Sequence, residues 1–271
     1  MRIYIQDKIT SLVGKVPKGT TVVRCDRNNL TSVEGLPEGV EEVNFIDNKL
    51  TSLKGLPQGV KKVWCGKNYI TSLEGLPEGI EVLGANNNRI TSLKGLPEGI
   101  DRIYVENNAF SVLEGLPASL ADIHCGVNEL TSLDGVPEGI KEIHCRETKI
   151  TSFKSLINCS KLRRVYCDYN SELTSLEGLP ESMFSLNCQD CNNLTSLDGL
   201  PHQLEYLDCC YCTNLTSIRG LPMGTDIKFN DTPIWRFISF VIGKPVTKKG
   251  YHMLGHVAIN GGKIKGLFKL F

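Results

Sequence analysis

The stretch TSVEGLPEGVEEVNFIDNKL, residues 31–50, determines the architecture of this 271-residue chain. Its pattern returns at a strict twenty-residue step, beginning again at Thr51, Thr71, Thr91, Ser111, Thr131 and Thr151. The next unit begins at Thr174, twenty-three residues later, the following two come at steps of twenty-one, and the register persists to about Leu221. A repeat of about twenty residues is the short end of the leucine-rich-repeat class. The sequence therefore predicts a solenoid.

Each repeat contains a triplet in which apolar and variable residues alternate, such as Val43-Asn44-Phe45 and Ile103-Tyr104-Val105. Alternation at period two indicates a strand with one buried face. Twelve such triplets run from Ile3-Tyr4-Ile5 to Ile227-Lys228-Phe229. We expect them to form a curved parallel sheet on the concave face.

The segment between strands begins Gly-Leu-Pro in most repeats, as in Gly-Leu-Pro-Glu-Gly at residues 35–39, 75–79 and 95–99. Proline cannot donate a backbone hydrogen bond and glycine weakens helices, so we expect extended or polyproline-like backbone there and little α-helix. Residues 155–162 lack this proline and could form one helical turn. We expect the leucines of these segments to be core residues: Leu36, Leu56, Leu76, Leu96 and Leu116.

One position in each repeat follows the strand and is usually asparagine: Asn28, Asn48, Asn68, Asn88, Asn108, Asn128 and Asn170. An inward asparagine side chain can satisfy backbone groups that the turn exposes. Thr148, Cys191 and Cys212 stand at this place in their own repeats, and cysteine is a recognised alternative in the repeat pattern. We predict a structural role for all of them.

The unit Leu-Pro-x-x-Ile/Leu-x-x-Leu-x-Val/Cys-x-x-Asn-x-Leu resembles the repeats of the YopM and IpaH group of bacterial type III effectors, over roughly residues 1–230. The resemblance implies a leucine-rich-repeat protein that acts in a host cytosol, as an effector or adaptor. Two family features are expected to be absent. The first strand begins at Met1-Arg2-Ile3, which leaves no preceding helical hairpin, and about forty residues after the repeats are too few for the ubiquitin-ligase domain.

We divide the chain into a solenoid of about eleven repeats, residues 1–230, and a C-terminal cap and basic tail, residues 231–271. Thirty basic and thirty acidic residues cancel, which gives the whole chain no electrostatic reason to bind nucleic acid. The apolar run 234–242 suits a cap over the end of the core and is too short to span a bilayer. A rival interpretation is contact with a membrane surface, because residues 263–271 mix lysines with large apolar side chains.

Seven of the eleven cysteines fall at one inward strand position: Cys25, Cys65, Cys125, Cys145, Cys167, Cys188 and Cys209. There they act as small hydrophobic residues. Many free thiols suit a reducing compartment, and the first residues show no apolar run typical of a signal peptide. We predict a cytoplasmic protein, with a host cytosol as one such location.

Two CxxC pairs, Cys188 with Cys191 and Cys209 with Cys212, are separated by seventeen residues, which also fits a four-cysteine zinc site. The repeat explains them without metal, because each pair combines the inward strand position with the asparagine position. We favour packing and expect no metal or other cofactor. Zinc remains the alternative interpretation of these four residues.

The outward positions of the strands are rich in aromatic residues, histidines and arginines, which dominate protein interfaces. Gly84 is expected to leave a notch among them, and His124 and His144 to lie one strand apart. The residues predicted to bind a partner are Arg24, Asn44, Trp64, Arg102, Tyr104, His124, His144, Arg146, Arg164 and Tyr166. The alternative is that large side chains simply cover the strand backbone.

The outward columns also contain carboxylates, but no nucleophile, phosphate-binding loop or base triad accompanies them. We therefore predict no enzyme activity and a protein-protein interaction module that binds a partner protein on its concave face. Two alternatives from other classes are a structural protein that assembles with itself and a membrane-surface protein that uses the basic tail. A particle size that changes with protein concentration would favour self-assembly. Co-sedimentation with liposomes that is lost on deletion of residues 231–271 would favour the membrane-surface protein.

Overall fold

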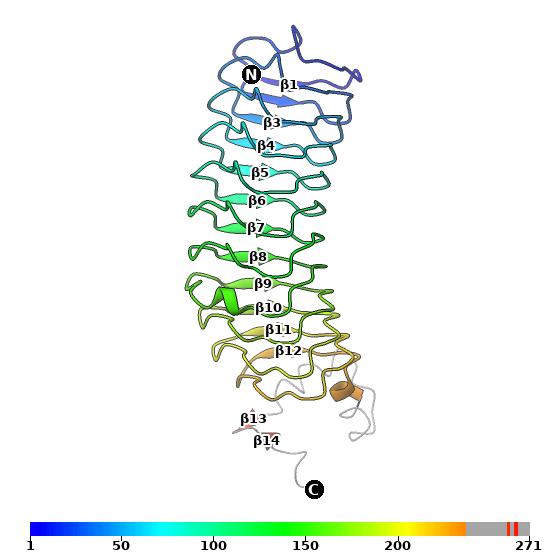
Figure 1. Ribbon diagram of the computed structural model, residues 1–271, viewed down its shortest axis with the longest axis vertical. Coiled ribbons are helices and arrows are strands. Elements are labelled where there is room, and N and C mark those ends of the chain that lie inside the picture. The colour runs from blue at the N-terminus through cyan, green and yellow to red at the C-terminus, as the bar shows by residue number, and fades with distance from the viewer. Residues whose placement is uncertain (237–258, 261–262, 265–271) are drawn as a thin grey trace. The chain divides into compact units, whose positions relative to one another are not determined.

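The computed structural model describes residues 1–236, 259–260 and 263–264. The chain divides into two compact units, residues 1–143 and residues 144–271. Each unit is built from coils, one coil being one sequence repeat with its strand (Figure 1). No helix of the described residues is long and apolar enough to cross a membrane.

The first unit contains a parallel sheet of three-residue strands that pair in chain order. Corresponding residues of successive coils stand opposite each other, for example Val43 with Val63. The strands are β1 (Arg2–Tyr4), β2 (Val22–Arg24), β3 (Glu42–Asn44), β4 (Lys62–Trp64), β5 (Val82–Gly84), β6 (Arg102–Tyr104) and β7 (Asp122–His124). Strand β8 (Glu142–His144) ends on the first residue of the second unit.

The second unit continues the same design, with β9, β10, β11 and β12 paired in parallel and in chain order. Their bounds are Arg164–Tyr166, Ser185–Asn187, Tyr206–Asp208 and Asp226–Lys228. The single predicted helical turn is present as the 3-10 turn η1 (Lys154–Leu156), and a two-stranded antiparallel pair joins β13 (Ile259–Asn260) to β14 (Lys263–Ile264). The predicted leucine-rich-repeat fold, with strands overlapping all twelve triplets, is confirmed.

The core of each coil consists of the inward strand residues and the apolar residues that follow them. In the coil of β3, Val43, Phe45, Leu50 and Leu53 are fully buried. The prediction for the leucines of the Gly-Leu-Pro segments is wrong for Leu36, Leu76, Leu96 and Leu116, which are half-buried, and only Leu56 is buried. The apolar residue three positions earlier is buried in each of these coils and fills the interior: Val33, Leu73, Leu93 and Leu113.

The first glycine of these segments also has a packing role. A Cβ on Gly35 (φ 100°) would lie 2.5 Å from the backbone nitrogen of Val13, whereas a Cβ on Gly39 (φ 87°) would meet nothing within 4 Å. Real Cβ atoms do not approach backbone so closely, so the first glycine lets successive turns pack. Gly39 therefore serves the positive φ alone.

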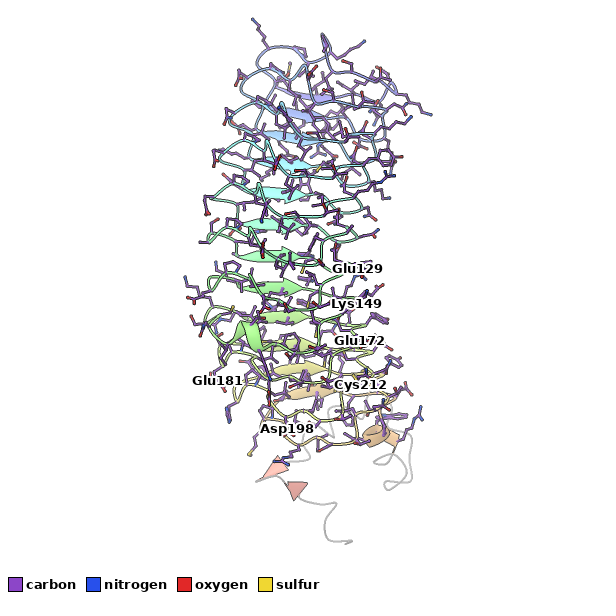
Figure 2. The ribbon with its side chains drawn as sticks, in the orientation of Figure 1. Glu129, Lys149, Glu172, Glu181, Asp198 and Cys212 are labelled. Carbon is purple, nitrogen blue, oxygen red and sulfur yellow. The ribbon has the colours of Figure 1, made fainter. Side chains whose placement is uncertain are left out.

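The predicted asparagine position forms a hydrogen-bonded ladder, confirming its structural role. Asn48 Nδ2 donates to the carbonyl oxygens of Cys25 at 2.8 Å and Phe45 at 3.0 Å, and Asn48 Oδ1 accepts from the backbone N–H of Leu30 at 2.9 Å. One amide thereby closes the turn and links two coils. In the coil of β11 this ladder position is held by Cys212, which is labelled in Figure 2.

The C-terminal segment is described only in part. Thr232 begins a helical turn, because its Oγ1 accepts a hydrogen bond from the backbone N–H of Trp235 at 3.1 Å. Most of the predicted capping run 234–242, from residue 237 onward, lies outside the described residues, as do residues 265–271 of the basic tail. The division at residue 230 stays a prediction.

Candidate functional site

The outward column of the first unit is the third residue of each strand, and its centre is occupied by rings. Successive strand residues point to opposite faces, so the residue beside a buried inward residue faces away from the core. Trp64, Tyr104 and His124 are half-buried, whereas their neighbours Val63, Ile103 and Ile123 are fully buried. The rings therefore lie on the sheet surface.

Trp64 covers Gly84, which corrects the predicted notch. A Cβ on Gly84 would lie 2.3 Å from Cε3 and 2.8 Å from Cζ3 of the Trp64 ring. The absence of a side chain at Gly84 lets the indole cross its strand towards Tyr104, and the two ring centroids are 5.8 Å apart with planes tilted by 35°. Gly84 brings aromatic rings together rather than leaving a gap.

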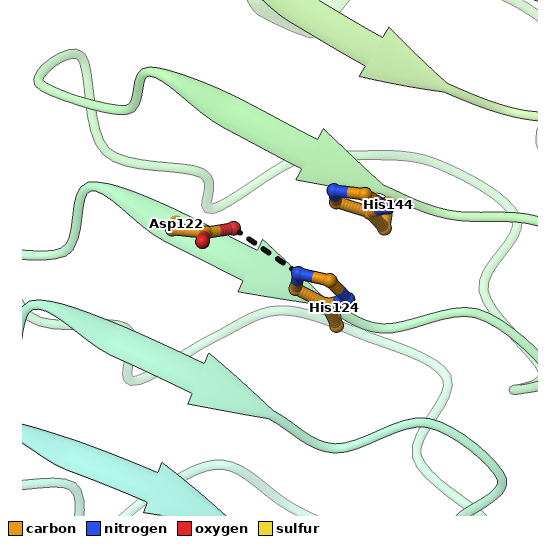
Figure 3. A group of neighbouring side chains, drawn as sticks. All are labelled: Asp122, His124 and His144. Carbon is orange, nitrogen blue, oxygen red and sulfur yellow. Dashed lines mark ion pairs between the residues drawn. The ribbon is translucent and has the colours of Figure 1, made fainter.

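His124 extends this group by one strand. Its ring centroid lies 4.5 Å from that of Tyr104, and its Nε2 lies 3.5 Å from Asp122 Oδ1 on the same strand (Figure 3). The two side chains of this pair are 21% and 22% exposed, so the pair is partly shielded from water. We call Trp64, Gly84, Tyr104 and His124 the aromatic platform.

Polar side chains border the platform. Arg102 Nε donates to Asp101 Oδ2 at 3.1 Å, and this hydrogen bond raises the pKa of Arg102, with a further contribution from Tyr104. Asn86 Oδ1 accepts from the backbone N–H of Glu106 at 3.0 Å.

The predicted residues Arg24 and Asn44 lie on neighbouring strands but make their own local contacts. Arg24 lies 3.6 Å from Glu42 in an ion pair, and its guanidinium lies 5.7 Å from the Tyr4 ring centroid. Asn44 Oδ1 accepts from the backbone N–H of Ile46 at 3.1 Å. Neither residue touches the rings of the platform in any contact described for it.

The second unit has aromatic contacts of its own. His144 and Tyr166 stack with centroids 4.2 Å apart and planes inclined by 15°, and Arg164 lies 5.2 Å above the Phe184 ring. Arg146 is exposed. His144, drawn in Figure 3 on β8, belongs to this unit. Here the structure brings together His144 with Tyr166 and adds Phe184, which sequence reasoning missed because it stands before the strand of its repeat.

A polar cluster on β11 and β12 was also missed. Tyr206 OH donates to Asp208 Oδ2 at 3.2 Å, and Lys228 Nζ lies 3.8 Å from the same oxygen. Asp208 is buried, and burial raises the pKa of Tyr206. The alternating pattern places Tyr206 and Asp208 on one face, which was the available signal.

All eleven cysteines are buried as reduced thiols. Burial raises the pKa of Cys65 to about 12, so such thiols are poor nucleophiles at neutral pH. Cys191 Sγ and Cys212 Sγ donate to carbonyl oxygens of the preceding strands, at 3.3 Å from Cys167 and 3.1 Å from Cys188. Over the described residues, no three or more cysteine sulfurs gather within 4.8 Å of one another. These contacts favour the packing interpretation over zinc.

No family model and no curated protein matches the chain. Solved structures do: YopM from Yersinia enterocolitica WA-314 is 22% identical with a TM-score of 0.53, over 80% of this chain and 57% of that chain. YopM from Yersinia pestis is 22% identical with a TM-score of 0.60, over 80% and 67%. The leucine-rich repeat domain of APL1B is 18% identical with a TM-score of 0.66, over 79% and 68%. Identities this low establish the fold, that of leucine-rich-repeat solenoids.

Proposed function

We propose that the protein is a non-enzymatic recognition module that binds a partner protein on the outward face of its sheet, with the aromatic platform at the centre of the contact. The observation that carries this proposal is the covering of Gly84 by Trp64, which joins three rings on the sheet surface. Tryptophan, tyrosine and arginine supply most binding energy at protein interfaces. The bordering Arg102 and Asn86 supply polar contacts.

The fold supports this role by analogy. Structures that share it include an octameric complex of latrophilin 3, Unc5D and the FLRT2 leucine-rich repeats, with a TM-score of 0.67 at 18% identity. The likeness to YopM extends the proposal to an effector-like protein in a host cytosol. Eleven buried thiols outside any disulfide agree with a reducing compartment. The second aromatic group, His144 with Tyr166, is a further contact point of the same kind.

The test compares matched variants in capture from host-cell lysate, followed by binding measurements with the purified partner. The platform variant combines Trp64→Ala and Tyr104→Ala. The control combines Tyr69→Ala and Tyr211→Ala, because these tyrosines are 44% and 46% exposed but lie outside the outward column. Circular dichroism verifies that both variants fold.

We expect the control to retain the partner and the platform variant to bind it at least tenfold more weakly, about 1.4 kcal/mol. Equal binding by both variants would reject the outward face as the site. If the particle size then grows with protein concentration in the absence of a partner, this would support self-assembly. Liposome binding that is lost on deletion of residues 231–271 would support the membrane-surface alternative.

A further inference from the structure

Each coil turns away from its strand at a residue with positive φ, and within each unit these turns follow one another as an edge. The backbone N–H of this residue donates to a carbonyl oxygen of the next coil, as Lys67 does to Asn86 at 2.9 Å and Asp190 to Cys210 at 3.0 Å. We call the segment from this residue to the one before the next buried leucine or isoleucine the turn edge. It comprises residues 67–69 in the coil of β4 and residues 190–193 in the coil of β10.

In the first unit the turn edge is basic. The coils of β2 to β5 place four exposed cations there, against the single acid Asp47: Arg27, Lys49, Lys67 and Arg89. In the part of the chain that the structure describes, none of these four cations forms an ion pair. Tyr69 lies among them, 44% exposed, with the Arg89 guanidinium 4.7 Å from its ring centroid.

In the second unit the turn edge is acidic. The coils of β9 to β11 place Glu172, labelled in Figure 2, and Asp190 there with no lysine or arginine, and Asp231 begins the next turn. Burial and the charge of Asp168 raise the pKa of Asp190, and no ion pair with a described residue offsets them. Two exposed tyrosines flank Asp190, one coil to each side: Tyr169 (54% exposed) and Tyr211 (46% exposed).

We propose that the basic turn edge of the first unit docks on the acidic turn edge of the second unit in another copy of this chain. The two edges are complementary in charge, and exposed tyrosines on both supply the apolar contact area. Both edges also have the same pitch of about 4.8 Å per coil, because both are set by parallel strands, so charges of successive coils can pair along the contact. The contact leaves the outward face free and does not depend on the partner-binding role.

The alternative is that these side chains are simply solvated, as turn residues on a protein surface usually are. That alternative gives no reason for the opposite signs of the two edges or for the distribution of exposed tyrosines. Among the described residues, four tyrosines are exposed, and three of them lie on the turn edge: Tyr69, Tyr169 and Tyr211. Four coils extend over only about 15 Å, and small interfaces bind weakly, so we expect self-association at micromolar concentrations and above.

The test measures sedimentation velocity of the full-length protein over a range of micromolar concentrations. At about 0.05 M salt we expect the mean sedimentation coefficient to rise with concentration, through a dimer or a longer chain of copies. At about 1 M salt the Debye length falls to about 3 Å, so the dissociation constant should rise about tenfold or more.

Charge-reversal variants place the contact on the two edges. The basic-edge variant combines Lys49→Glu and Lys67→Asp, and the acidic-edge variant combines Glu172→Lys and Asp190→Lys. Lys67 and Asp190 hold equivalent positions with the same φ of 56°, so each accepts the residue type of the other. We expect each variant alone to self-associate about tenfold more weakly or not at all.

An equimolar mixture of the two variants should recover the self-association of the wild type. In the mixture the intact acidic edge of one variant meets the intact basic edge of the other, and the two reversed edges again have opposite signs. This recovery is specific to a contact between the first unit of one copy and the second unit of another.

The control variant combines Lys18→Glu and Lys54→Glu. It changes the net charge as much as the basic-edge variant does, at exposed positions outside the turn edge where Glu38 and Glu74 stand in other coils. We expect it to self-associate like the wild type. The platform variant should do the same, which separates failure of this proposal from failure of the partner-binding role.

Three outcomes overturn the proposal. The first is a wild-type protein that stays monomeric at low salt over the whole concentration range. The second is self-association that both edge variants retain, or that the control variant loses to the same extent. The third is a mixture of the edge variants that stays monomeric, which would mean that the two edges do not face each other. Circular dichroism and Tm of each variant establish that folded proteins are compared.

Discussion

The first unit and the second unit satisfy the same kind of buried backbone groups with different side chains at the ladder position. In the first, the ladder position is asparagine from Asn28 to Asn128, and in the second it is Thr148, Asn170, Cys191 and Cys212. Asparagine donates to two coils and accepts from a third backbone group, whereas the cysteine thiol donates to the preceding coil alone. Thr148 differs from both, because its Oγ1 donates to the Cys145 carbonyl of its own coil and to Asn170 Oδ1 of the following coil. The position therefore calls for a buried hydrogen-bond donor, and the carbonyl that this donor serves changes with the residue type.

Removal of a ladder asparagine should have the greatest effect on stability. Asn68→Ala removes the acceptor of the buried Leu50 N–H. It also removes one of the two amide donors to the carbonyl oxygens of Phe45 and Cys65, which keep Asn48 and Asn88 respectively. The orphaned N–H costs about 1–3 kcal/mol and each lost hydrogen bond about 1 kcal/mol, so we expect a loss of about 4 kcal/mol. Urea titration followed by circular dichroism measures the free energy of unfolding.

The matched change in the second unit is Cys191→Asn, which introduces the usual ladder residue. We expect the free energy of unfolding to change by less than about 1 kcal/mol, because a donor to the Cys167 carbonyl is retained. We attribute the role of the ladder position to its hydrogen bonds and not to one particular residue type. Equal losses in the free energy of unfolding for Asn68→Ala and Cys191→Asn would contradict this view.

The Gly-Leu-Pro leucines differ in burial from coil to coil, in both units. Leu76 in the first unit is half-buried, whereas its counterpart in the second unit, Leu200, is buried with 7% exposure. Truncation of a buried leucine costs about 2–5 kcal/mol. We expect Leu200→Ala to lie within that range and Leu76→Ala to cost about 1 kcal/mol.

Leu73, which is fully buried, supplies the reference for an interior leucine. Leu73→Ala should cost about 3 kcal/mol, clearly more than Leu76→Ala three residues later in the same coil. Urea midpoints for the three variants give the ranking Leu73 and Leu200 above Leu76. A loss for Leu76→Ala as large as that for Leu73→Ala would restore the sequence-based core assignment.

The sequence predicted the fold because its signals repeat. The alternation in Val43-Asn44-Phe45 and the ladder residue Asn48 are each reinforced by the same pattern twenty residues away, so packing between coils has one solution. The error over Leu36 and its counterparts has a local cause. The repeat spacing shows that a position is apolar. It does not show how deeply the side chain at that position is buried, because the preceding turn determines this.

The candidate site was less predictable because outward positions do not repeat. The sequence placed Trp64 and Tyr104 on the correct face, but the covering of Gly84 depends on a ring orientation that no periodicity encodes. A column of non-glycine residues with positive φ, such as Asp47 (φ 62°) and Val127 (φ 54°), was also missed. Its residue types vary freely, so the backbone conformation imposed by the ladder overrides local preference.

A single exposed hydrogen bond, absent from one coil of the first unit, should give the weakest effect. Ser92 Oγ accepts from the backbone N–H of Lys94 at 3.2 Å, and Ser175 makes the same bond to Glu177 in the second unit. Val112 occupies this position in its coil, is 52% exposed and has no polar atom to offer. Val112→Ser should therefore stabilise the protein by about 0.5 kcal/mol.

The reverse substitution provides the control, because Ser92→Val removes the bond from an otherwise equivalent coil. It should destabilise the protein by about the same 0.5 kcal/mol, because it removes from one coil the hydrogen bond that Val112→Ser adds to another. Thermal unfolding of the two variants against the wild type resolves the difference. A shift of both melting temperatures in the same direction would show that the serine oxygen contributes nothing, and that this turn is held by the glycine that follows it and by packing alone.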